Sequence, residues 1–285
     1  METPSPLTWR AKQQIFHWHG HAISYQQAGQ GAVILLLHSF PGSSWDWHAL
    51  WPALAQHGTV VAPDLLGCGD SDKPWPYYYS LGSQAELIRA LLKRLGTQHC
   101  HIIAHDSGAL IAHKLIAVNR HHSIKPLSMH WLNPRHPRFN WHWRERLWAS
   151  ASGNWWCRGL SAAGLQRYYQ ACARLPLPRH YCQDAFELLQ AHGGLRVLSA
   201  LLAYRHEPWE WLHPPAGYSG PVQLISGQQR HALWLQRAFM QAQHVKCAAG
   251  HWPHLEMPEL LYLQLQPYLP PAGNHVLTNL LRALP

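Results

Sequence analysis

The chain has 285 residues, enough for one large hydrophobic core with a smaller inserted unit. Hydrophobic residues make up 47% of it, a fraction that excludes a disordered chain. The formal net charge of +9 comes from 23 Lys and Arg against 14 Asp and Glu, so it reflects a shortage of carboxylates. Because no basic run carries interleaved aromatic residues, the sequence predicts no nucleic-acid partner.

The N-terminal residues carry no recognisable targeting signal. Residues 1–6 lack the basic and apolar regions of a signal peptide, and the longest early apolar run, residues 32–37, is too short to cross a bilayer. The six cysteines are scattered without a paired spacing, which is typical of free thiols in a reducing compartment. We therefore expect a cytoplasmic protein with no transmembrane segment.

Strands and helices are expected to alternate in the first third of the chain. Residues 13–25 alternate loosely between apolar and polar types and turn at Gly20, which predicts an antiparallel hairpin. Residues 33–38 form a continuous apolar run, typical of a strand buried on both faces. The other elements that we expect here are a helix over 45–56, a strand over 59–63 and an amphipathic helix over 80–95.

Residues 101–113 predict a strand, a sharp turn and a helix. A turn of this kind holds its central residue in a strained backbone conformation, so it needs small residues two positions before and two after. Ala104 and Gly108 meet that need around Asp106. Centring the turn on Ser107 instead would put the bulky His105 at a cramped position. The pattern favours Asp106 as a nucleophile, while the alternatives are Ser107 as nucleophile or an Asp106 that only caps the helix.

The second half of the chain contains an irregular segment between strands. A strand is expected over 126–132, and residues 134–212 then carry seven of the 16 tryptophans and ten arginines but no lysine. Helical patterns within this segment cover 160–174 and 184–204. Strands are expected again over 222–226 and 244–248, before a closing helix over 258–269. The segment 134–212 is therefore interpreted as a domain inserted into a core made of 1–133 and 213–285.

Four motifs resemble those of the α/β-hydrolase superfamily, on its branch with aspartate nucleophiles. They are the turn around Asp106, the loop 36–47 (LLHSFPGSSWDW), the loop 64–74 (DLLGCGDSDKP) and the segment 250–258 (GHWPHLEMP). Within the superfamily, they are most similar to haloalkane dehalogenases, epoxide hydrolases and mesoderm-specific transcript proteins. The resemblance covers about residues 34–269. It implies a mostly parallel, eight-stranded α/β-hydrolase sheet with helices on both faces, and a helical cap at 134–212.

The resemblance also implies the roles of the site residues. Asp106 would attack an electrophilic carbon to give an ester, and His251 would activate the water that hydrolyses it. His254 is a rival base, although the family places the base directly after a glycine. The backbone N–H groups of Phe40 and Ser107 would form the oxyanion hole.

The third member of the family's catalytic triad is missing from its usual place. Relatives have an acid three residues after the glycine that ends the penultimate strand, whereas this chain has Gly227 followed by Arg230. Asn133, after the preceding strand, is a possible His-orienting replacement, because an amide oxygen can orient a histidine. Glu145, Glu207 and Glu210 are looser candidates. The alternative is that no third residue exists and the site is degraded.

The substrate class is only partly indicated. Ser107 and Phe40 stand where dehalogenases have a tryptophan and an asparagine that hold the halide, which argues against dehalogenation. A small apolar substrate, epoxide- or ester-like, is expected, with cap tyrosines as proton donors. The lining candidates are Trp45, Tyr168, Tyr169, Tyr204 and Trp252, with Tyr181 as a further tyrosine. The rival functions are a serine esterase that uses Ser107 and an inactive homologue that acts as a binding protein.

No cofactor and no metal site are predicted. The histidine-rich stretches 17–21 and 99–101 each place two histidines on one face of a strand, but no third ligand is indicated.

Overall fold

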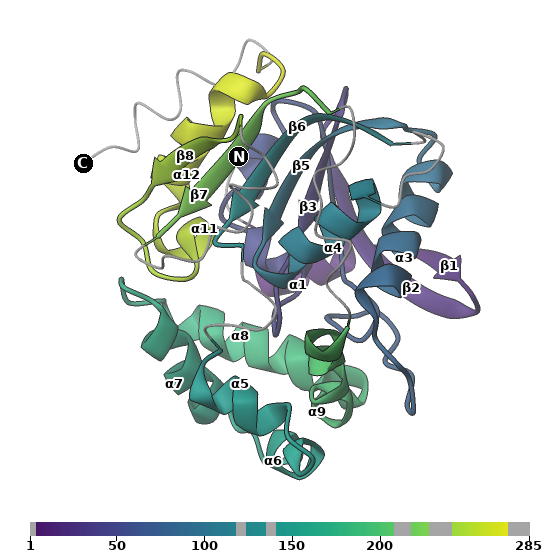
Figure 1. Cartoon of the computed structure of the whole chain (residues 1–285), viewed down its shortest axis with the longest axis vertical. Helices are drawn as coiled ribbons and strands as arrows, with labels where there is room; N and C mark the ends of the chain where they lie inside the picture. The colour runs from purple at the N-terminus through teal and green to yellow at the C-terminus, as the bar shows by residue number, and fades with distance from the viewer. Residues whose placement is uncertain (1–3, 118–123, 135–140, 208–217, 228–240, 273–285) are drawn as a thin grey trace.

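The computed structural model describes residues 4–117, 124–134, 141–207, 218–227 and 241–272, and contains an eight-stranded sheet. The strand order is β1-β2-β4-β3-β5-β6-β7-β8, and every pair from β4 onward in that order is parallel (Figure 1). This confirms the mostly parallel α/β architecture expected from the sequence. The strands are β1 (Gln14–Trp18), β2 (His21–Ala28), β3 (Val33–Leu37), β4 (Thr59–Pro63), β5 (His99–His105), β6 (Lys125–Leu132), β7 (Val222–Ser226) and β8 (Gln243–Lys246).

The two antiparallel strands lie at one edge of the sheet. β1 and β2 form a hairpin in which Trp18 pairs with His21 across a two-residue turn. Both turn residues, His19 (φ 49°) and Gly20 (φ 80°), have positive φ, as the tight hairpin turn that suits twisted strands requires. β2 then pairs antiparallel with β4. The hairpin predicted around Gly20 is confirmed.

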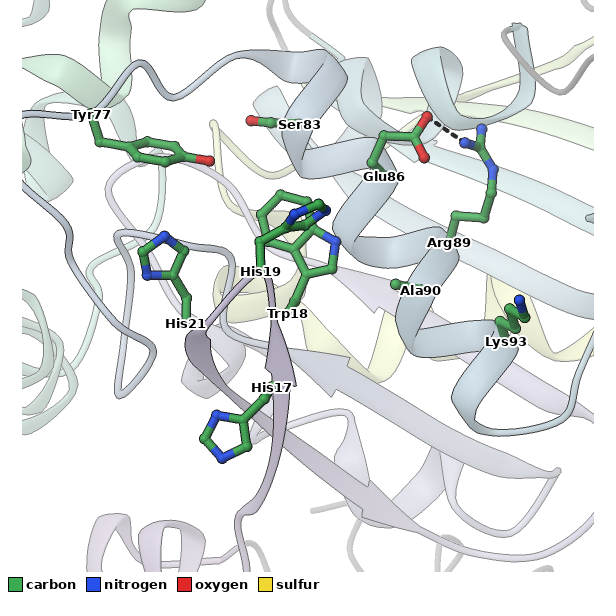
Figure 2. A pocket seen from close by; sticks show the side chains of 10 residues that line it. All are labelled: His17, Trp18, His19, His21, Tyr77, Ser83, Glu86, Arg89, Ala90 and Lys93. Carbon is green, nitrogen blue, oxygen red and sulfur yellow. Dashed lines mark hydrogen bonds and ion pairs between the residues drawn. The ribbon is translucent and has the colours of Figure 1, made fainter.

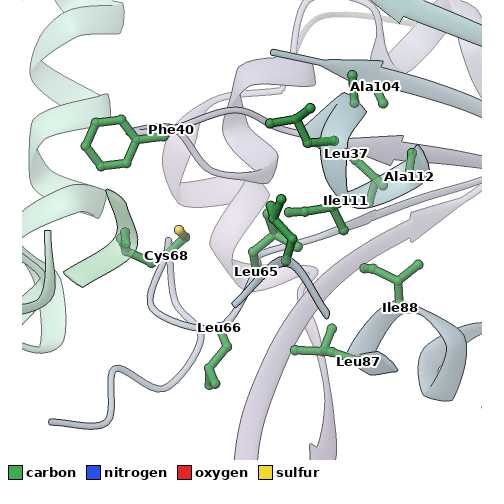
Figure 3. Close-up of a cluster of buried hydrophobic side chains, with 14 of the residues drawn as sticks. Leu37, Phe40, Leu65, Leu66, Cys68, Leu87, Ile88, Ala104, Ile111 and Ala112 are labelled. Atoms are coloured by element: carbon green, nitrogen blue, oxygen red, sulfur yellow. The ribbon is translucent and has the colours of Figure 1, made fainter. Parts of the chain in front are cut away.

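Helices cover both faces of the sheet because alternate residues of the central strands point to opposite sides. On β3, Leu35 and Leu37 join a cluster with apolar residues of α3 and α4, part of which is drawn in Figure 3. Ile34 and Leu36 join a second cluster with residues of α2 and α12. The helices of the core are α1 (Pro6–Ala11), η1 (Ser44–Trp47), α2 (Trp51–Leu54), α3 (Leu81–Arg94), α4 (Ser107–Ala117), α11 (Pro253–Glu256), α12 (Pro258–Leu265) and η4 (Gln266–Tyr268).

A layer of helices is inserted between β6 and β7. It occupies the lower part of Figure 1, where α5 packs on α6, α6 on α9, and α7 on α8. Its ring contacts with the core include Phe40 against Trp148, with centroids 6.2 Å apart. These elements are α5 (Trp143–Trp148), α6 (Gly153–Arg158), α7 (Ala162–Cys172), α8 (Arg179–Gln190), η2 (Ala191–Gly193), α9 (Gly194–Val197) and η3 (Ala200–His206).

Two expected helices are broken in the structure. The helix predicted over 184–204 stops at Gln190, because His192 (φ 52°) and Gly193 (φ 77°) adopt left-handed conformations there. The helix predicted over 45–56 is divided into η1 and α2. Among the described residues, no helix combines the length and hydrophobicity that a membrane span requires.

Candidate active site

The sharp turn that follows β5 is centred on Asp106. This residue has a positive φ of 48°, lies just before the first residue of α4, and is almost fully buried. Its N–H donates to the carbonyl of Leu132 over 3.0 Å. A Cβ at Gly108 would lie 2.5 Å from the carbonyl oxygens of Leu37 and His38, so only glycine fits. The turn thus brings α4 against β3 and holds Asp106 at the carboxyl end of β5.

His251 lies in the loop between β8 and α11 and faces Asp106. Its Nε2 is 3.5 Å from Asp106 Oδ2, and both side chains are buried. The His251 backbone is held on two sides: its N–H donates to the carbonyl of Cys172 in the inserted helices, and its carbonyl lies 2.8 Å from His105 Nε2. The two residues predicted as nucleophile and base are therefore adjacent.

The Phe40 N–H, which the sequence assigned to the oxyanion hole, is bound to a neighbouring hydroxyl. It donates to Ser107 Oγ over 2.9 Å. Ser107 is the first residue of α4, so its own N–H lies at the amino end of the helix. The loop after β3 and the turn after β5 therefore do converge. To bind an oxyanion, the Phe40 N–H would have to exchange its bond to the Ser107 hydroxyl for one to the anion.

Asn133 binds the loop of His251 through backbone groups. Its Nδ2 donates to the carbonyl oxygens of Gly250 (2.8 Å) and His251 (2.9 Å), and its Oδ1 accepts from the N–H of Gly227 over 2.8 Å. The sequence predicted that the amide oxygen would face the imidazole ring, whereas it accepts from the Gly227 backbone instead. In the structure these bonds join three carboxyl-terminal strand ends, so Asn133 positions His251 by way of its main chain.

Glu256 was not predicted as part of the site, yet it anchors the same loop. Its carboxylate accepts hydrogen bonds from four backbone N–H groups, those of Arg174, Leu175, Gly250 and Trp252, over 2.8–3.0 Å. A Cβ at Gly250 would lie 2.4 Å from the Arg174 nitrogen, so the two segments touch. The sequence signal that could have found it is the spacing. Glu256 stands six residues after Gly250, and the short helix α11 between them brings its carboxylate back to the Gly250 N–H.

Comparisons with known proteins identify the family to which this fold belongs. The sequence pattern of the alpha/beta hydrolase fold family matches residues 32–258. The chain belongs to the α/β-hydrolase fold family. It is 37% identical to the mesoderm-specific transcript homolog protein of Homo sapiens over 121 residues, which are 40% of this chain and 36% of that protein. It is 38% identical to the soluble epoxide hydrolase of Corynebacterium sp. (strain C12) over 102 residues, 36% of this chain and 35% of that enzyme.

The alignments with these curated relatives span only about a third of each relative's length. Among solved structures, Cfl2 of Burkholderia cenocepacia superposes with a TM-score of 0.79 at 22% identity, covering 90% of this chain and 95% of that one. That similarity shows a shared fold over most of this chain. It supports the architecture of the family, whereas the chemistry has to be inferred from the residues of the site.

The looser candidates for the triad acid are bound elsewhere in this α/β-hydrolase fold. Glu145 accepts from the Tyr168 hydroxyl (2.6 Å) and from the His142 N–H (2.8 Å). Glu207 accepts from the N–H of Leu81 at the start of α3. Glu210 and Arg230 lie outside the described residues.

His254 packs in the core instead of facing Asp106. It is fully buried, and its ring centroid lies 4.5 Å from that of His105 and 4.8 Å from that of Trp47. Burial lowers the pKa of His254 well below its ordinary value, and the neighbouring His105 and His251 lower it further. A neutral core histidine fits this position better than a base.

The cap tyrosines meet the core beside the His251 loop. Tyr169 packs against Trp252, with ring centroids 4.7 Å apart, and Trp252 lies at the same distance from His251. The Tyr181 hydroxyl donates to Asp46 Oδ1 over 2.9 Å. Burial raises the pKa values of Tyr169 and Tyr181 well above 10, so both hydroxyls keep their protons at neutral pH.

The other lining candidates take part in packing. Trp45 stacks on His48 at 4.3 Å, and Tyr204 lies 5.7 Å from Trp141. Tyr204 also borders a small, partly open cavity of about 30 Å³, which has room for a water molecule. Its walls include Phe40 and Ser107, so this space adjoins the proposed oxyanion position.

The histidine-rich hairpin does not build a metal site. In Figure 2 the ring of His17 lies apart from those of His19 and His21, although all three histidines line an open groove beside α3. Throughout the described part of the chain, no three His, Cys, Asp or Glu side chains are grouped to hold a metal ion.

Proposed function

We propose that this protein is a hydrolase that opens a small apolar electrophile, epoxide- or ester-like, by covalent catalysis. With an epoxide, an Asp106 carboxylate oxygen attacks a ring carbon, the carbon–oxygen bond breaks, and the released oxygen takes up one proton. His251 then removes a proton from water, whose oxygen attacks the Asp106 carboxyl carbon. Cleavage of that ester releases a diol and restores the carboxylate.

The observation that carries this proposal is the pairing of Asp106 with His251. The 3.5 Å separation of Oδ2 and Nε2 leaves the base beside the carboxyl carbon that water must attack. Tyr169, one ring away from His251 through Trp252, is a candidate donor for the oxygen of the opened ring. The epoxide hydrolase among the relatives supports the same chemistry.

The contacts of Ser107 argue against the serine esterase. A serine nucleophile needs its hydroxyl directed at the catalytic base, whereas Ser107 Oγ accepts from the Phe40 N–H. The residue at the centre of the turn, with positive φ, is Asp106, whereas Ser107 is the first residue of the helix that follows. We expect Ser107→Ala to keep the capacity for ester formation.

Isotope labelling tests the covalent step. In a single turnover in ¹⁸O-labelled water, the diol should stay unlabelled because its new oxygen comes from Asp106, and the label should appear in the peptide that holds Asp106. His251→Gln should accumulate the substrate's mass on that peptide, while Asp106→Asn should accumulate none. Label that appears directly in the first-turnover product, or an adduct on Ser107, would overturn the proposal.

A further inference from the structure

The outer surface of the cap combines exposed tryptophans with arginines. Trp155 is 70% exposed, Trp143 60% and Trp156 43%. All three lie on α5 and α6, which pack on one another, and α6 forms the end of the molecule farthest from the sheet (Figure 1). A group of large aromatic side chains as exposed as these often marks an interaction site, because burying their apolar area against a partner is favourable.

The stretch of sequence that contains these tryptophans is rich in arginine. Between residues 141 and 183, the sequence contains six arginines and a single acidic residue, Glu145. Glu145 is fully buried and holds the Tyr168 hydroxyl, so it leaves the surface without a carboxylate in this stretch. The arginines of the stretch are Arg144, Arg146, Arg158, Arg167, Arg174 and Arg179.

The local geometry presents the two residue types together. The guanidinium of Arg144 lies over the Trp143 ring, 4.4 Å from its centroid. Trp155 and Trp156 are in edge contact at 4.6 Å, and Arg158 follows them in the same short helix, exposed. We call the set Trp143, Arg144, Arg146, Trp155, Trp156 and Arg158 the Trp–Arg surface.

We propose that the Trp–Arg surface docks this protein on an anionic phospholipid membrane. Tryptophan partitions to the boundary between headgroups and acyl chains, because its ring is apolar and its N–H is polar. Arginine pairs with lipid phosphates, and residues 141–183 expose no carboxylate that would repel those phosphates. No membrane-spanning helix is needed for such peripheral attachment. The inference concerns a surface outside the catalytic residues and goes beyond the proposed hydrolase chemistry.

Vesicle sedimentation tests the proposal with the full chain. We expect the protein to sediment with sucrose-loaded vesicles of equal parts phosphatidylglycerol and phosphatidylcholine, and to bind pure phosphatidylcholine much less. Trp155→Ala with Trp156→Ala should lower the partition coefficient at least about tenfold, the effect of withdrawing one large apolar side chain. Arg146→Gln with Arg158→Gln should lower it about 25-fold, at about fivefold per cation near the surface.

The control uses aromatic residues of similar exposure on the core. Trp75 is 41% and Tyr78 59% exposed in the loop before α3, and Trp75→Ala with Tyr78→Ala should leave partitioning unchanged. Circular dichroism establishes that each variant is folded. The proposal is overturned if the natural protein stays in solution, if the core variant loses as much binding, or if both lipids bind alike. Preference for a single-stranded RNA oligonucleotide over the vesicles would assign the surface to nucleic acid instead.

Discussion

Glu256 shows how a single carboxylate can hold a catalytic loop and the cap together. Two of its backbone donors, Gly250 and Trp252, flank His251, and the other two follow α7. In Glu256→Gln, an NH₂ group replaces one of the two carboxylate oxygens, so a side-chain donor faces a backbone N–H donor. We expect Glu256→Gln to lower the free energy of unfolding by about 2 kcal/mol, the scale of bonds to a charged acceptor, and to lower kcat because the His251 backbone shifts.

Glu259→Gln is the matched control for that change. Glu259 is three residues further along, exposed on α12. Its replacement should change stability by less than about 0.5 kcal/mol, as is usual for surface positions. Equal effects of the two substitutions in urea denaturation would show that the four N–H bonds are not important for the loop.

Arg230 stands at the position where the family has the third member of its triad. If Asn133 and Glu256 suffice to position His251 through its backbone, Arg230→Asp leaves turnover unchanged or lower. If the triad is broken, the same change returns an acid to the family's position and raises turnover by up to about 10⁴-fold. We expect the first outcome, because Asp106 and His251 remain paired at 3.5 Å. Steady-state turnover of both proteins distinguishes the two cases.

Local patterns predicted the residues that the backbone itself requires. Ala104 and Gly108 identified the turn at Asp106, because the need for small residues depends on positions two apart along the chain. Asn133 and Glu256 were harder, because their partners are backbone groups of segments distant in the sequence. Nothing in residues 130–136 indicates that an amide there will meet the carbonyl of His251, 118 residues away.

At the scale of elements, the contact between η1 and α8 joins the core to the cap. The Tyr181 hydroxyl of α8 donates to the buried carboxyl of Asp46 in η1. Burial raises the pKa of Asp46 to about 7, and the bond from Tyr181 opposes that rise. The strength of this connection therefore depends on the protonation of one group near neutral pH.

The substitution Tyr181→Phe tests this connection. The lost hydrogen bond is stronger when Asp46 is ionised, so the variant should lose about 1 kcal/mol more stability at pH 8 than at pH 6. Denaturation at both pH values measures the difference. Tyr78→Phe, an exposed position, should show none. A penalty for Tyr181→Phe that is independent of pH would mean that Asp46 does not titrate in this range.

The elements themselves were predicted unevenly, for a physical reason. Strand β3 was clear from its apolar run, since burial on both faces favours apolar residues at every position. The break after α8 was missed, although Gly193 and Gly194 are a local signal for it, because the apolar pattern on either side of them resembles one continuous helix.

For the whole molecule, buried histidines set the response to acid. A chain of hydrogen bonds crosses three strands of the sheet: His101 Nδ1 to Ser128 Oγ, Ser128 Oγ to His130 Nε2, and His130 Nδ1 to Gln223 Oε1, at 2.7–2.8 Å. Because the Gln223 oxygen only accepts, Nδ1 of His130 carries a proton, while the Ser128 hydroxyl has one proton to share between the two rings that it contacts. Burial lowers the pKa of His130 to about 4, so the ring is neutral at neutral pH.

This neutral ring makes the fold lose stability as the pH falls. The unfolded chain takes up a proton on His130 near its ordinary pKa of about 6.5, whereas the folded protein does so only near 4. Between these values the unfolded state holds more protons, so stability decreases with decreasing pH. His48, whose pKa burial also lowers to about 4, adds to the loss. Asp46, with its pKa raised to about 7, opposes it, because there the folded state holds the proton.

We therefore expect urea denaturation to give a lower free energy of unfolding at pH 5 than at pH 7, and we expect His130→Gln to reduce that difference by about 2 kcal/mol. Glutamine can keep hydrogen bonds to Ser128 and Gln223 but does not titrate, so the informative quantity is the change between the two pH values, whatever the variant's absolute stability. His17→Gln, at an exposed position of β1, should leave the difference as it is. If His130→Gln retained the full pH dependence, the acid sensitivity would belong to other groups, and the buried chain of hydrogen bonds would have to tolerate a charged ring.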